Sequence, residues 1–140
     1  MPLTSATNVT LMIYAPGNPT ENIIIGGVFG TDPLGGIHNI GWGAFANNMN
    51  VKSITIRTSV KFIQNNAFEY SLVQTITLDH VAPSGINNGS TGYPSGWNPF
   101  LNIVNSTLTV RVPNATGSGQ LLAWQTTFGP PNYPPINIIN

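Results

Sequence analysis

Cysteine is absent from this 140-residue chain, and charged residues make up only 6% of it, four basic against four acidic. The lack of cysteine excludes disulfides, thiol catalysis and thiolate metal ligands together. A neutral surface has little long-range field to attract nucleic acid or an anionic membrane, and copies of the chain repel one another little. We therefore expect neutral partners, such as a protein or glycan surface, or self-association into a homo-oligomer or filament.

Long apolar runs are also missing. No stretch approaches the roughly 20 apolar residues of a membrane span, and residues 1–5 lack the basic start and apolar core of a signal peptide. We expect no membrane span and a location that is extracellular, at the cell surface or in a virion, reached after removal of a leader or by another route. With 41% hydrophobic residues, residues 1–140 are expected to form one domain.

One stretch of the chain nearly repeats itself after 23 residues. The shared pattern is apolar-x-x-apolar-x-x-x-Ala-Phe, formed first by Ile37, Ile40, Ala44 and Phe45, then by Val60, Ile63, Ala67 and Phe68. An alternating apolar segment follows each Ala-Phe pair, with Val51, Ile54 and Ile56 in one unit and Val73, Ile76 and Leu78 in the next. This alternation predicts a short strand in each unit. A fixed period of this length indicates a solenoid, and Phe45 and Phe68 are expected in its core.

A weaker third unit follows a long insertion. Phe100 lies 8 residues before Leu108, as Phe68 lies 8 residues before Ile76. Residues 82–98 are rich in Pro, Gly, Ser and Asn and are expected to form an inserted loop. Insertions in a solenoid tend to lie on one face, often the binding face.

These units resemble the BspA-type leucine-rich repeats of bacterial and protist surface proteins. The resemblance is close over residues 37–78 and partial to Val112, where Val112-Pro113 and Trp124 are similar to the family's C-terminal cap. Residues 47–49 stand where many members carry a Cys, and the long third connection is atypical. The resemblance implies a mostly β, non-catalytic solenoid with a parallel sheet of about three rungs. It also implies a role in surface recognition or adhesion, without naming a ligand.

Caps are expected on both sides of the repeat core, which covers residues 37–112. Residues 1–36 form the N-terminal cap, in which a strand beginning at Val9 covers the first rung and the glycines of residues 25–30 are turn residues. Residues 113–140 form the C-terminal cap and a Pro-rich tail. The tail ends with Ile136, Ile138 and Ile139, which either pack on their own domain or add a strand to another copy.

Alignment of the predicted strands places two columns on the outward face of the sheet. One column contains Thr55, Thr77 and Thr109, and the next contains Arg57, Asp79 and Arg111. The charged column has two interpretations, a set of surface ion pairs that fixes the register or a polar binding patch.

Aromatic residues near turns supply further binding candidates, namely Trp42, Tyr93 and Trp97. Rings in polar loops offer a large apolar area at a small entropic cost. The alternative is that Tyr93 and Trp97 fold back onto the third repeat.

Catalytic and metal sites find little support. The acids are Glu21, Asp32, Glu69 and Asp79, and they form no pair of the kind that glycoside hydrolysis requires. His38 and His80 are 42 residues apart, which is no metal-ligand spacing. We expect no enzyme activity, no cofactor and no metal.

Two functions remain. The first is a non-catalytic recognition or adhesion module that binds a protein or glycan, as the family resemblance implies. The second is a self-assembling structural subunit of a virion, tail fibre or extracellular filament, which the neutral composition and the apolar tail favour.

Overall fold

The computed structural model describes residues 9–11, 14, 18–28, 31–32, 34–86, 99–100, 103–104, 108–128 and 136–140. Over these residues the chain is mostly β-sheet, as expected, with one α-helix and one 3-10 helix. The strands are β1 (Val9–Leu11), β2 (Asn22–Ile25), β3 (Ile37–Ile40), β4 (Ser53–Ile56), β5 (Phe62–Ile63), β6 (Thr75–Leu78), β7 (Leu108–Arg111) and β8 (Ile136–Ile139). The helices are η1 (Pro83–Gly85) and α1 (Gln120–Phe128).

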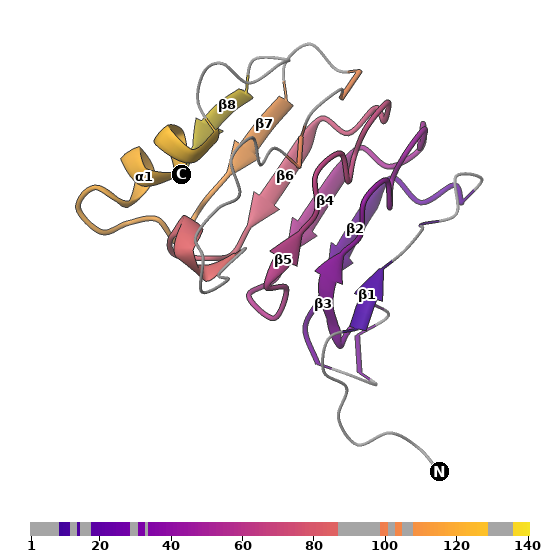
Figure 1. The fold of residues 1–140 in the computed structure, drawn as a ribbon, viewed down its shortest axis with the longest axis horizontal. Coiled ribbons are helices and arrows are strands. Elements are labelled where there is room, and N and C mark those ends of the chain that lie inside the picture. The colour runs from indigo at the N-terminus through magenta and orange to yellow at the C-terminus, as the bar shows by residue number, and fades with distance from the viewer. Residues whose placement is uncertain are drawn as a thin grey trace.

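The described strands pair in parallel and form two sheets (Figure 1). One is three-stranded, in the order β1-β3-β5, and the other is five-stranded, in the order β2-β4-β6-β7-β8. From β1 to β6 the chain alternates between the sheets, so each strand pairs with the next but one. Parallel strands need such crossovers, because a tight hairpin joins only antiparallel strands. The expected parallel sheet of about three rungs is thus too small, because β2 and the pairing of β1, β3 and β5 into a second sheet were not foreseen. The strands expected at Val9 and at the C-terminal tail are present as β1 and β8.

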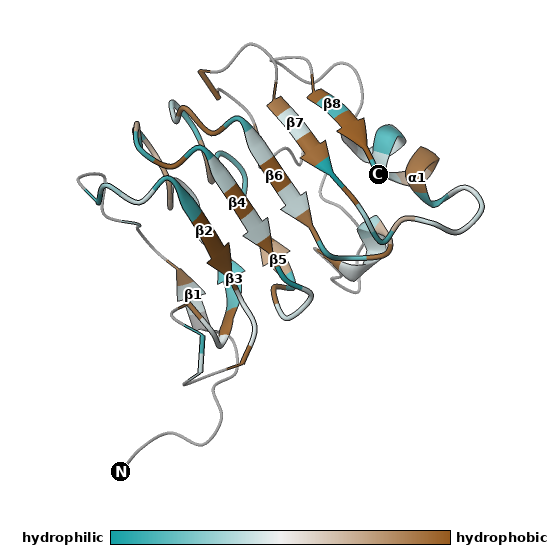
Figure 2. Ribbon diagram, turned by 180° about the vertical axis from the view of Figure 1, so that it is seen from behind, coloured by the Kyte–Doolittle hydropathy of each residue, from teal (hydrophilic) through white to brown (hydrophobic). Residues whose placement is uncertain are grey.

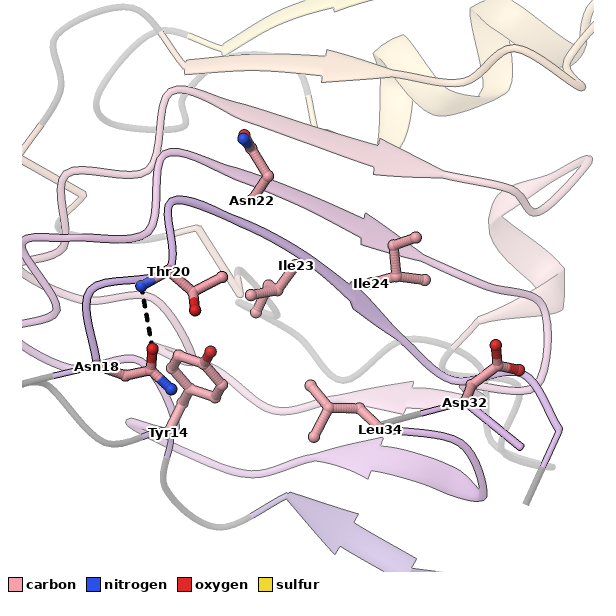
Figure 3. Close-up of a pocket in the computed structure, with 8 residues that line it drawn as sticks. All are labelled: Tyr14, Asn18, Thr20, Asn22, Ile23, Ile24, Asp32 and Leu34. Carbon is pink, nitrogen blue, oxygen red and sulfur yellow. Dashed lines mark hydrogen bonds between the residues drawn. The ribbon is translucent and has the colours of Figure 1, made fainter. Parts of the chain in front are cut away.

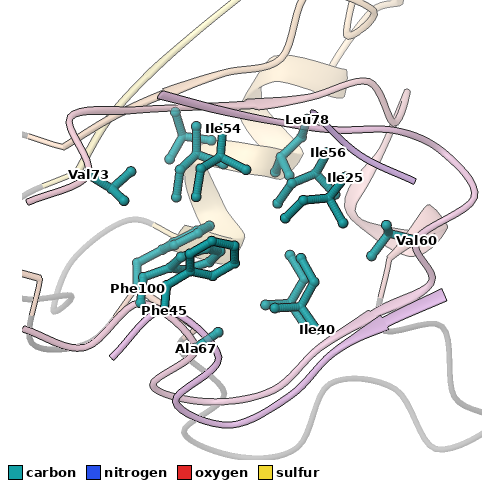
Figure 4. Close-up of a cluster of buried hydrophobic side chains, with 14 of the residues drawn as sticks. Ile25, Ile40, Phe45, Ile54, Ile56, Val60, Ala67, Val73, Leu78 and Phe100 are labelled. Atoms are coloured by element: carbon teal, nitrogen blue, oxygen red, sulfur yellow. The ribbon is translucent and has the colours of Figure 1, made fainter. Parts of the chain in front are cut away.

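The hydrophobic core lies between the two sheets. Strands β4 and β6 bury every second residue. Their inward side chains have exposed fractions of 1% or 0%, and they are Ile54, Ile56, Ile76 and Leu78. Figure 4 shows Ile40, Phe45 and Ala67 facing this layer from the opposite side. The alternation predicted for the two strands is therefore confirmed.

A column of aromatic rings runs through this core. Its members are Tyr14, Phe45, Phe68 and Phe100, and successive ring centroids lie 5.3, 5.3 and 5.9 Å apart. Phe45 and Phe68 are fully buried, as predicted. Each ring belongs to a separate pass of the chain, so the column connects the units along the length of the sheets.

The N-terminal residues provide one such pass. Tyr14 precedes Ile23 by nine residues, the same spacing that separates Phe45 from Ile54. Strand β2 pairs with β4 in register, with Ile23 beside Ile54. The segment expected as a cap therefore supplies the first strand of the five-stranded sheet.

The C-terminal segment lies at the other end of that sheet. Trp124 of α1 is fully buried, and its Nε1 donates a hydrogen bond to the Val81 carbonyl oxygen at 3.3 Å. In the turn that leads into α1, Gln120 Oε1 accepts a hydrogen bond from the Gly117 amide at 2.6 Å. Strand β8 pairs with β7 of the same chain, which is the first of the two arrangements expected for the tail. None of the described helices has the length and apolar character needed to cross a membrane.

Asn48 stands in the segment where the resembling family carries a Cys. Its side chain is fully buried. The Oδ1 atom accepts hydrogen bonds from the amides of Asn50 and Val51 at 3.0 and 2.9 Å. Asn48 thus satisfies the backbone donors of the turn that leads into β4.

Left-handed backbone recurs at matching positions of the two central units. Two residues before the core Phe stand Gly43 (φ 66°) and Asn66 (φ 56°), and two residues after it stand Asn47 (φ 59°) and Tyr70 (φ 56°). Gly has no Cβ, and the short polar side chain of Asn can hydrogen-bond locally, so both adopt this conformation readily. Tyr has neither advantage, and its Cβ lies close to the following carbonyl oxygen. Tyr70 is 51% exposed, so its ring contributes little packing in return.

Substitution Tyr70→Asn should therefore raise the free energy of unfolding by about 0.5–1 kcal/mol. Urea unfolding of the two proteins measures the difference. Tyr70→Ala is the matched control, because it also removes the ring but supplies no polar side chain that can hydrogen-bond locally at a positive φ. An equal gain in both variants would show that ring exposure, not backbone strain, is the cause.

Candidate functional site

The outward side chains of the five-stranded sheet form two rows across all its strands, and we call this surface the outer sheet face. The first row is Asn22, Ser53, Thr75, Thr109 and Asn137. The second row is Ile24, Thr55, Thr77, Arg111 and Ile139. Each of these residues is exposed or half-buried, and they alternate with the buried core residues of the same strands. Figure 2 views the molecule from the side of this sheet.

The predicted Thr column is correct for two of its three members. Thr55 lies opposite Thr77, but Thr109 lies opposite Thr75, and Ile76 pairs with Val110 rather than with Leu108. A shift of two residues keeps the same side chains on the buried face, so hydrophobic alternation does not distinguish the two registers. Thr109 still belongs to the outer sheet face, in the other row.

The predicted ladder of Arg57, Asp79 and Arg111 is wrong. Arg111 lies opposite Thr77, and the Arg57 guanidinium instead pairs with Asp32, with Nη1 and Oδ2 3.4 Å apart. The other ion pair among the described residues joins Lys52 and Glu21 at 2.8 Å. Both ion pairs lie near the β2 end of the sheet, and neither ties β6 to β7.

The outer sheet face is consequently almost free of charge, since Arg111 is the one ionic side chain in its two rows. Its hydroxyl and amide groups can both donate and accept hydrogen bonds. One such bond is made within the face, from Ser53 Oγ to Asn22 Oδ1 at 2.6 Å. Neighbouring strands hold these groups roughly 4.8 Å apart, so the face is a regular array that suits an uncharged, hydroxyl-bearing or peptide ligand.

A hollow of about 510 Å³ lies beside β2, next to the outer sheet face (Figure 3). Its lining residues are Tyr14, Asn18, Thr20, Asn22, Ile23, Ile24, Asp32 and Leu34. Tyr14, Ile23 and Leu34 make its surface largely apolar, and Asn18 and Thr20 add polar groups joined by a hydrogen bond from the Thr20 amide to Asn18 Oδ1 at 3.0 Å. The one sequence signal that points to this hollow is the nine-residue spacing that Tyr14 and Ile23 share with Phe45 and Ile54.

Of the predicted aromatic candidates, only Trp42 is among the described residues, and it lies away from this site. Trp42 is 63% exposed, but it follows β3 in the three-stranded sheet, and its amide donates to Gln64 Oε1 at 2.8 Å. Tyr93 and Trp97 lie outside the described residues, as does most of the inserted loop. Phe100, at the end of that loop, belongs to the buried aromatic column.

The glycines after β2 use their amides within the protein. Gly27 N donates to Ser59 Oγ at 2.8 Å, and Gly26 N donates to the Leu34 carbonyl oxygen at 3.0 Å. Both glycines have positive φ angles, 91° for Gly26 and 103° for Gly27. They are turn residues, as predicted, and neither amide is directed at an anion.

The acidic side chains considered as catalytic candidates each interact with a different partner and do not form a cluster. Glu69 accepts a hydrogen bond from Asn66 Nδ2 at 3.0 Å, while Glu21 and Asp32 are in ion pairs. In the part of the chain that the structure describes, no three His, Asp or Glu side chains come together as a metal site requires. His38 and His80 likewise belong to no such group of metal-ligating side chains among the described residues.

His80 is a core residue, with 2% of its surface exposed. Its Nε2 lies 2.7 Å from the Val60 carbonyl oxygen, to which the neutral ring donates. Burial is the largest influence on the His80 pKa and lowers it below its usual 6.5, with nearby Lys61 acting in the same direction. The hydrogen bond to Val60 and the neighbouring Asp79 oppose this shift without reversing it.

Because the folded-state pKa of His80 is depressed, the unfolded chain takes up its proton first as the pH falls. The free energy of unfolding should be constant above a pH of about 7 and decrease below about 6.5, by at most about 1.4 kcal/mol per pH unit. Urea unfolding between pH 8 and 5 measures this slope before the carboxylates titrate. His80→Gln should abolish it, whereas His38→Gln should retain it; a slope that survives in His80→Gln would contradict the assignment.

Comparison of the chain with protein-family models, with curated proteins and with solved structures finds no match.

Proposed function

We propose that the chain is a short solenoid of the leucine-rich-repeat type, and that it serves as a recognition module. Its ligand is a neutral glycan or a protein surface, and the outer sheet face is the binding surface. Such a module acts outside the cell, on its surface or on a virion.

The solenoid assignment is supported by the recurrence of one path through the molecule. A strand of the smaller sheet, a ring of the aromatic column and a strand of the larger sheet follow one another in β1–Tyr14–β2, β3–Phe45–β4 and β5–Phe68–β6. Equivalent residues of successive passes pair in register, as Ile23, Ile54 and Ile76 do. Repeated passes that stack on their neighbours are typical of solenoids.

The outer sheet face is the observation that carries the recognition role. Eight of its ten residues bear hydroxyl, amide or guanidinium groups, and the two exceptions are Ile24 and Ile139 in the strands at its ends. A rigid sheet holds these groups in place before a ligand arrives. The protein therefore loses little conformational freedom when the ligand binds. The scarcity of charge favours a neutral ligand over a nucleic acid or an acidic polymer.

A non-catalytic role is supported by the same geometry. The Thr and Ser hydroxyls of the outer sheet face have no His or carboxylate among their described hydrogen-bond partners, so no base activates them as nucleophiles. Trp42, His38 and His80 lie elsewhere in the fold.

The alternative function is a self-assembling structural subunit of a virion, tail fibre or filament. The near absence of charge favours it, since the formal net charge is zero. Its expected contact, the tail with Ile136, Ile138 and Ile139, is used within the chain, where β8 pairs with β7 and Ile138 is 7% exposed. Assembly through the tail would require β8 to leave this sheet.

The recognition proposal is tested with Thr55→Ala/Thr77→Ala, which removes two adjacent hydroxyls from the centre of the outer sheet face. The probes are immobilised cellulose, chitin, dextran and mannan, with heparin as an anionic comparison. We expect binding to at least one neutral probe and an affinity about 10-fold lower in the double variant, as the loss of two hydrogen bonds implies.

Thr58→Ala is the matched control, because Thr58 is exposed in the turn after β4 rather than on the outer sheet face. It should bind as the unaltered chain does. Preference for heparin, or equal affinity of the double variant and the unaltered chain, would reject the outer sheet face as the binding surface. If none of the neutral probes binds, the glycan form of the proposal fails.

A further inference from the structure

The two edge strands of the five-stranded sheet, β8 and β2, differ in whether another described element covers them. At one end α1 packs beside β8 (Figure 1), and Gln125 Nε2 donates to the Ile138 carbonyl oxygen at 3.5 Å. A helix placed over an edge strand prevents further strand pairing. At the other end, the described residues place no strand beyond β2.

Among the described residues, no backbone hydrogen bond uses the peptide groups of β2 at this edge. The amides of Ser53 and Arg57 in and after β4 donate to the carbonyl oxygens of Glu21 and Ile25 at 3.1 and 2.9 Å. Odd-numbered residues of β2 therefore face β4, and Asn22 and Ile24 direct their N–H and C=O groups to the outer edge. These are the groups that an added strand would bond.

The described residues of this edge also lack several features that natural proteins use to prevent pairing. Such features are Lys or Pro in the strand, or a charge that stays unpaired beside it. Strand β2 contains only Asn and Ile, and Ile24 is 48% exposed. The nearest acids, Glu21 and Asp32, are neutralised by ion pairs with Lys52 and Arg57.

The hollow adds an apolar surface next to these peptide groups. Tyr14, Ile23 and Leu34 line it, and Tyr14 is the last ring of the aromatic column. Ile23 keeps 8% of its surface exposed, whereas its partner Ile54 in β4 keeps 1%. The difference arises because Ile54 lies in β4, which has β2 on one side and β6 on the other. Ile23 lies in β2, for which the described residues provide one neighbouring strand, β4.

We propose that β2 pairs antiparallel with β2 of a second copy, which makes the protein a two-fold dimer. Asn22 then lies opposite Ile24 of the second copy and Ile24 opposite its Asn22, and each pair exchanges two backbone hydrogen bonds. Pairing ends after Ile24, because the Gly26 amide already donates to Leu34.

A second copy is the occupant that the observations favour. The edge is self-complementary under a two-fold axis, as an isologous interface must be. The chain has no net charge, so two copies approach without repulsion. Since α1 covers the β8 end, assembly stops at two copies and does not extend into a filament. This dimer goes beyond the recognition role, because it forms without ligand.

Cysteine pairing tests the register directly, because the natural chain contains no cysteine. Asn22→Cys and Ile24→Cys proteins, mixed in equal amounts and mildly oxidised, should form a mixed disulfide dimer. Opposite residues have Cα atoms about 5.5 Å apart, within the range of about 4.4–6.8 Å that a disulfide accepts. Each variant alone should cross-link at least five-fold less, because like residues lie diagonally, about 7–8 Å apart.

Sedimentation equilibrium over a concentration series measures assembly without any cross-link. The unaltered chain should approach twice its monomer mass, and Ile24→Lys should remain a monomer with unchanged circular dichroism. Leu122→Lys is the matched control, since Leu122 is 64% exposed on α1 and should leave the dimer intact. A mass that stays monomeric, or grows beyond two copies, overturns the proposal, as does equal cross-linking of the single variants and the mixture.

Discussion

In-register parallel pairing of β2, β4 and β6 is the constraint on which the other features of the molecule depend. Because Ile23, Ile54 and Ile76 hold the same place in successive strands, inward side chains stack into one core and outward ones into rows. The same pairing brings the rings of Phe45 and Phe68 within 5.3 Å of each other. A slip by one residue would turn each buried side chain of a strand toward solvent. The same strand register therefore determines both the core and the outer sheet face.

The sequence predicts register only where one unit closely copies another. Thr55 and Thr77 belong to units of nearly equal length, and their pairing follows from aligning the repeats. Thr109 comes after a long insertion, so its distance from Thr77 carries no information about register. Alternation then leaves registers two residues apart equally acceptable, since both bury the same side chains. Backbone contacts that the sequence pattern does not encode place Thr109 beside Thr75.

Other elements escaped prediction because their signals are short or arise only on folding. Strand β5 has two residues, too few for any periodicity. In α1, Trp124 is the fully buried side chain among residues 120–127, and Leu121 packs partly buried against the core, so the helix has no continuous apolar stripe over these residues. The hollow joins Tyr14, Ile23 and Leu34, which approach one another only when the first pass of the chain has closed. Ion pairing of Arg57 with Asp32, in place of Asp79, depends on that same closure.

Low charge density connects the two proposals. A sheet face whose one ionic side chain is Arg111 suits a neutral ligand, and an edge strand without charge suits another copy of itself. The proposed two-fold pairing would join two outer sheet faces into one continuous surface, with Asn22 and Ile24 at its centre. A repetitive ligand such as a polysaccharide would then be held at two places at once, and avidity would strengthen a weak contact at each.

A filament would need both ends of the sheet to be open, and α1 covers one of them. The asymmetry of the two ends thus favours a bivalent recognition unit over an extended polymer.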